Sequence, residues 1–132
     1  MSALGNYWRF QVKNVTGSAS GATASTIKGQ RWKPGSAGEA DYEGSEQTFL
    51  SEASIASGGY ANGTAYNNDS SAGYYGLAGL ITIVNGTSAG NYEVYIQQSP
   101  DGGTTWPDDG LGELIMTIYA GVSATVKKSI NL

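Results

Sequence analysis

The segment that decides the fold is residues 92–119, which read YEVYIQQSPDGGTTWPDDGLGELIMTIY. Apolar and polar residues alternate in its first part, Tyr92–Gln98, and again in its last part, Glu113–Tyr119. Alternation with a period of two is typical of half-buried β-strands. The residues between the two parts are rich in glycine, aspartate and proline, which favour turns. The segment therefore predicts two strands joined by a structured connection.

Five further stretches carry strand signals. They are Tyr7–Val15, Thr26–Lys33, Thr48–Ile55, Leu77–Val84 and Val122–Leu132. Helical periodicity is weak, because glycines interrupt nearly every window that is long enough to carry it. We therefore predict an all-β chain that forms one domain over residues 1–132. The expected architecture is an antiparallel β-sandwich, jelly-roll or Greek-key like, with long Gly/Ser-rich loops or arms.

The strand patterns also predict local features. In the first strand, the alternation places Trp8, Phe10 and Val12 on one apolar face. The dipeptide Asn85-Gly86 favours a type I′ turn after the fourth strand. Lys128 interrupts the apolar row of the last strand, which predicts an edge strand or a strand end.

The composition excludes several kinds of function. The 132 residues include 20 glycines but no cysteine and no histidine. This chain can therefore have no disulfide framework, no Cys/His zinc site, no histidine-based triad and no thiol nucleophile. Its net charge of −4 disfavours nucleic acid, whose binding needs a basic surface. No apolar stretch approaches the ~20 residues that span a bilayer, and we expect neither a membrane partner nor a signal peptide.

Two polar segments do not fit a core and are expected to be flexible loops or arms. They are residues 16–25, TGSASGATAS, and residues 57–73, SGGYANGTAYNNDSSAG. Exposed tyrosines are common anchors at interfaces, and the second segment contains two of them. The candidate partner contacts are Tyr60, Tyr66, Tyr74, Tyr75 and Trp32. Disordered linkers are the alternative for both segments.

The most specific motif is the eight-residue run SPDGGTTW at residues 99–106. It resembles the Asp-box, a turn known from sialidases and other propeller proteins, at Ser99, Asp101, Gly103, Thr105 and Trp106. In such a turn the aspartate accepts backbone N–H bonds, the glycine permits positive φ and the tryptophan packs under the hairpin. A propeller needs several copies, and this chain has one, so the resemblance implies a structural turn. A metal or sugar contact at Asp101 is the alternative.

Four carboxylates lie in or just after this turn, at Asp101, Asp108, Asp109 and Glu113. Clustered oxygen ligands can bind Ca²⁺, but the spacing of an EF-hand is absent. We expect a solvated acidic loop, with no metal and no cofactor. Nothing singles out the carboxylate pair that a glycosidase requires, and we expect no enzymatic activity.

The hairpin segment Glu93–Ile115 carries a second resemblance. A short, cysteine-free, Gly/Ser/Thr/Ala-rich all-β chain with this hairpin is similar to small virion structural proteins of tailed bacteriophages, above all head decoration (cement) proteins. The resemblance implies a non-enzymatic virion protein, assembled in the host cytoplasm, that forms homo-oligomers, commonly trimers. Its partner would be the major capsid protein or another virion protein, reached by flexible arms. A tail or fibre component and a carbohydrate-binding β-sandwich are the alternatives.

Overall fold

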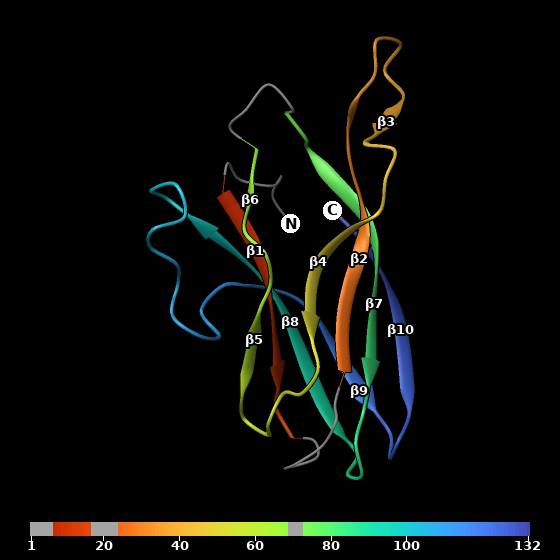
Figure 1. Ribbon diagram of the computed structural model, residues 1–132, viewed down its shortest axis with the longest axis vertical. Coiled ribbons are helices and arrows are strands. Elements are labelled where there is room, and N and C mark those ends of the chain that lie inside the picture. The colour runs from red at the N-terminus through yellow and green to blue at the C-terminus, as the bar shows by residue number, and fades with distance from the viewer. Residues whose placement is uncertain (1–6, 17–23, 69–72) are drawn as a thin grey trace.

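The computed structural model describes residues 7–16, 24–68 and 73–132. These residues form ten β-strands and no helix, so none of them belongs to a helix that could cross a membrane. The strands build two antiparallel sheets that pack face to face in an elongated body (Figure 1). The predicted all-β sandwich is confirmed.

Each sheet contains five of the described strands. Sheet A runs in the order β5-β1-β8-β9, and β6 also pairs with β1. Its strands are β1 (Tyr7–Asn14), β5 (Tyr60–Asn62), β6 (Tyr66–Asn67), β8 (Gly90–Ser99) and β9 (Glu113–Ala120). Sheet B runs in the order β10-β7-β2-β3, and β4 also pairs with β2. Its strands are β2 (Ala24–Pro34), β3 (Ala40–Tyr42), β4 (Gln47–Glu52), β7 (Gly76–Val84) and β10 (Thr125–Asn131).

Strands that are distant in sequence are neighbours in both sheets. β1 pairs with β8 over its whole length, and β2 pairs with β7, so the two central pairs are nested in chain order. Among consecutive strands, β2 pairs with β3 and β8 pairs with β9. At other points the chain crosses from one sheet to the other, for example between β1 and β2 and between β7 and β8. This nesting excludes an up-and-down meander and is the kind of connection that the predicted jelly-roll or Greek-key topology requires.

The core between the sheets contains the face of β1 that the alternation predicts. Trp8, Phe10 and Val12 have no exposed surface. Phe49 of β4 packs against both rings, with its ring centroid 5.7 Å from that of Trp8 and 5.9 Å from that of Phe10. Aromatic side chains bury ~150–250 Å² each, so this cluster supplies much of the apolar area that holds sheet B against sheet A.

The two long sides of the sandwich differ. On one side the backbone itself links the sheets, because the N–H of Thr64 donates to the carbonyl oxygen of Phe49 at 2.9 Å. On the other side lie the edge strands β9 and β10, where Ile115, Met116 and Val126 pack on the core but stay partly exposed. No described strand pairs with the outer edge of either. The sandwich is therefore closed on its β4–β5 side and open on its β9–β10 side.

The expected type I′ turn at Asn85-Gly86 is wrong. Neither residue has positive φ, and the following strand β8 belongs to the other sheet, so no hairpin forms here. The buried Asn85 side chain instead joins the two sheets: its Nδ2 donates to the carbonyl of Gly121 at 2.8 Å, and its Oδ1 accepts from the Tyr92 hydroxyl at 2.8 Å. These bonds satisfy a polar group that would otherwise be unpaired in the core.

The segment 57–73 is not one flexible arm. It contains β5 and β6, which pair in turn with β1 and form the edge of sheet A. Residues 24 and 25 of the other expected arm belong to β2, and residues 17–23 and 69–72 lie outside the described residues. The prediction from Lys128 is confirmed, because β10 is an edge strand.

Candidate functional site

β9 is an edge strand whose sequence is mostly apolar. Its eight-residue sequence, ELIMTIYA, contains one charged residue. No described strand pairs with its outer edge. A register shift opposite Val94 and Tyr95 places two β9 residues against one of β8, which is a β-bulge. Apolar residues therefore occupy both faces of β9, although only one face can contact the core.

Exposed large hydrophobic residues concentrate around this strand. Four of the seven in the described part of the chain lie in β9 or directly beside it. They are Leu111 (73% exposed), Leu114 (50%), Tyr119 (67%) and Val122 (63%). We call these four residues the β9 patch. Exposed apolar groups next to an unpaired sheet edge make this strand a candidate interaction surface.

The neighbouring edge strand β10 has the opposite character. It carries Lys127 and Lys128, both exposed, and neither forms an ion pair within the described residues. Lysines on an edge strand oppose pairing with another chain, because pairing would bury their charge. β10 therefore has two lysines that protect its edge, whereas β9 has no lysine and carries only Glu113 and the bulge as protecting features.

The Asp-box-like turn lies in the connection between β8 and β9. Asp101 Oδ1 accepts the backbone N–H of Thr105 at 2.7 Å and the hydroxyl of Ser99 at 2.9 Å. Hydrogen bonds from the side chain and backbone of Thr105, and then from Ser99, lower the pKa of Asp101 to about 2. Gly102 and Gly103 have φ of 77° and 91°, values that side chains disfavour.

The tryptophan of this turn lies on the outer face of sheet A and not in the core. Trp106 is half-buried, and its Nε1 donates to the carbonyl of Gly103 at 3.1 Å. The guanidinium of Arg9 lies 4.4 Å from the centre of its ring. Arg9 in turn donates from Nε to Gln97 at 2.7 Å, so the turn is fixed to both β1 and β8.

The connection 100–112 covers the outer face of sheet A. Gln11, which points away from the core, is nevertheless fully buried. Its Nε2 donates to Asp109 at 2.9 Å and to Asn62 at 2.8 Å, and its Oε1 accepts the N–H of Gly110 at 3.1 Å. This buried amide positions the connection, and thereby Leu111 of the β9 patch.

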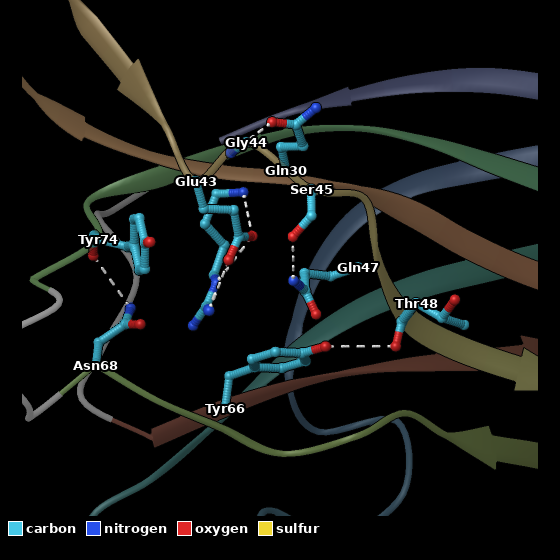
Figure 2. A network of polar contacts seen from close by, with 10 residues as sticks. Gln30, Glu43, Gly44, Ser45, Gln47, Thr48, Tyr66, Asn68 and Tyr74 are labelled. Carbon is cyan, nitrogen blue, oxygen red and sulfur yellow. Dashed lines mark hydrogen bonds and ion pairs between the residues drawn. The ribbon is translucent and has the colours of Figure 1, made fainter.

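An arginine of β2, Arg31, lies between two aromatic rings at one end of the sandwich and joins the two sheets. Figure 2 shows the polar contacts in this region, with Glu43, Tyr66 and Tyr74 labelled. The guanidinium carbon of Arg31 lies 4.8 Å from the centre of the Tyr66 ring and 4.4 Å from that of Tyr74. Glu43 accepts its Nη2 at 2.9 Å and its Nε at 3.2 Å, a two-point ion pair. Tyr66 also stacks on Trp8, with ring centroids 5.2 Å apart. Burial raises the pKa of the Tyr66 hydroxyl.

The five candidate contact residues have different surroundings. Tyr66 and Tyr74 enclose Arg31, and the ring of Tyr60 lies 5.3 Å from the ammonium of Lys13. Trp32 is half-buried on β2, and Tyr75 is 58% exposed. The sequence patterns did not single out the β9 patch. A usable signal was present: a strand with one solvated face should alternate between apolar and polar residues, and ELIMTIYA has apolar residues on both faces.

The acidic residues near the turn do not converge. Among the described residues, no three carboxylates form a group that could hold a metal ion. Asp101 faces its own turn, and Asp109 accepts from Gln11.

The comparisons with known proteins give no relative. The sequence matches no protein-family model, and neither the curated proteins nor the solved structures give a match.

Proposed function

We propose that this chain is a non-enzymatic structural protein of a tailed-phage virion, in which it decorates the head lattice and binds its own copies. The observation that carries the proposal is the open, apolar edge of β9. The hairpin that ends in this strand, residues 93–115, is also the segment that resembles head decoration proteins. The absence of histidine and cysteine from the sequence favours a protein that acts by binding.

The β9 edge can supply both affinity and specificity. An added strand would pair with its unpaired N–H and C=O groups, and the side chains of the β9 patch would then be covered. A specific interface buries ~800 Å² on each partner, and aromatic anchors such as Tyr119 contribute most strongly to it. The lysines of β10 direct this contact to β9 rather than to both edges.

The rest of the molecule supports a rigid connector. The Asp-box-like turn and the buried Gln11 hold the 100–112 connection against sheet A. Arg31 of sheet B, which is ion-paired with Glu43, contacts the ring of Tyr66 and so joins sheet B to sheet A at one end. A connector of this kind needs no bound cofactor and no moving part.

The test is the composition of purified virions. We expect peptides of this chain at stoichiometric levels in particles from the phage that encodes it, and density of this shape on the capsid surface by cryo-electron microscopy. Density on the tail would assign it to the tail or fibre instead. Particles that lack the chain would overturn the proposal.

A further inference from the structure

The outer edge of sheet B is interrupted between β3 and β4, and the interruption leaves a hollow. β3 pairs with β2 up to Tyr42, and β4 pairs with the same strand from Gln47 onward. The hollow has a volume of about 280 Å³ and is lined by Gly29, Gln30, Tyr42, Glu46 and Ala78. Small-molecule sites occupy ~300–1,000 Å³, so this one would accept one or two sugar rings rather than a large ligand.

Two of the lining residues, Gly29 and Ala78, are small and form the floor of the hollow. Gln30 of β2 lies opposite Ala78 of β7, and Gly29 lies opposite Gly79. A Cβ atom at Gly29 would collide with the backbone of Ala78, so the two strands approach closely here. Because Gly29 and Ala78 carry little or no side chain, a flat ligand can reach the backbone of the sheet here.

Three groups with different chemistry face this floor. Tyr42 is 48% exposed. Gln30 is oriented by the N–H of Gly44, which its Oε1 accepts at 3.1 Å, and its Nε2 donates to no group in the described part of the chain. Glu46 is exposed, and its carboxylate has no hydrogen-bond or ion-pair partner among the described residues. An oriented donor, a free acceptor and an aromatic ring thus surround one hollow.

We propose that this hollow binds a neutral saccharide. A sugar offers an apolar ring face for Tyr42 and hydroxyls that can accept from Gln30 and donate to Glu46. The free carboxylate and the net charge of −4 oppose acidic sugars, because both would repel a second carboxylate. The hollow lies on sheet B and the β9 patch on sheet A, so this site is separate from the assembly surface and does not depend on the proposed function.

The experiment begins with a glycan array that carries neutral oligosaccharides of glucose, galactose, mannose and N-acetylglucosamine beside sialylated ones. The best neutral glycan is then titrated into isotopically labelled protein at millimolar concentration. We expect amide shifts at Gly29 and Gly44. Tyr42→Ala and Glu46→Ala should each weaken binding at least tenfold. The control Thr125→Ala, an exposed residue of β10 that lies opposite Val84 and away from the hollow, should bind as the unaltered protein does.

Three results would overturn this assignment. The first is that no neutral glycan shifts the amides around the hollow at millimolar concentration. The second is that folded Tyr42→Ala and Glu46→Ala variants, checked by circular dichroism, bind as well as the unaltered chain. The third is a preference for sialylated glycans, which would contradict the neutral class.

Discussion

Removal of the Arg31 side chain tests how the two sheets are joined. The side chains of Arg31 and Glu43 are only 14% and 6% exposed, so Arg31→Ala leaves a nearly buried carboxylate without its partner. Breaking such a pair from one side lowers the free energy of unfolding by about 3–5 kcal/mol, with the lost contacts to Tyr66 and Tyr74 included. For a domain of this size the melting temperature should fall by roughly 10–20 °C.

The assay is urea and thermal unfolding followed by circular dichroism. Glu43→Ala and the Arg31→Ala/Glu43→Ala double variant complete a cycle, which separates the pair from the two side chains taken singly. Arg31→Lys should recover only part of the loss, because an ammonium neither forms the two-point contact nor stacks as a guanidinium does. Lys127→Ala, an exposed cation on β10, is the control and should change stability by less than ~0.5 kcal/mol.

The prediction that Arg31 joins the sheets is wrong if the free energy of unfolding of Arg31→Ala lies within ~0.5 kcal/mol of that of the unaltered protein. It also fails if the double variant loses the plain sum of the two single losses, because the pair would then contribute no energy of its own.

Two further predictions concern the Asp-box-like turn. The pKa of Asp101 is lowered from 3.8 to about 2, so the stability it contributes is present above about pH 4 and is lost as the pH falls toward 2. Asp101→Asn should therefore remove part of the acid dependence of the urea midpoint, and an unchanged acid profile would contradict this. Gly103→Ala should destabilise the protein by about 1 kcal/mol or more, because φ is 91° there. Its control is Gly121→Ala, where an added Cβ meets only ordinary contacts; equal melting temperatures for the two variants would refute the strain.

The long strands could be predicted because apolar and polar residues alternate along them, and this alternation follows directly from the burial of one face. The alternation in β1 and β8 identifies Trp8 and Val94 as core residues, and both are fully buried. β5 and β6 have only three and two residues, too short for a period, and they are strands because β1 is there to pair with them. Tertiary pairing of this kind overrides local turn chemistry.

The surroundings of the candidate residues could be predicted less well. The outward position of Gln11 follows from the alternation, but its burial depends on a connection about a hundred residues later in the chain. Tyr66 lies in a polar, glycine-rich segment, which predicts an exposed side chain. Its ring instead contacts the guanidinium of Arg31, which lies on the inner face of β2. Which edge of a sandwich stays free is a property of the topology, so the significance of Tyr119 emerges only with the strand order.

The central claim is that this chain assembles through the free edge of β9. The most direct test is the mass of the purified protein in solution at high micromolar concentration, by light scattering or native mass spectrometry. We expect a defined multiple of 13.7 kDa, with a trimer favoured. The variant Leu114→Asp/Tyr119→Asp should be monomeric and equally folded, while Leu80→Asp, on exposed β7 surface, should keep the assembly. A monomeric unaltered protein, or an assembly that survives both charges in β9, would contradict the claim.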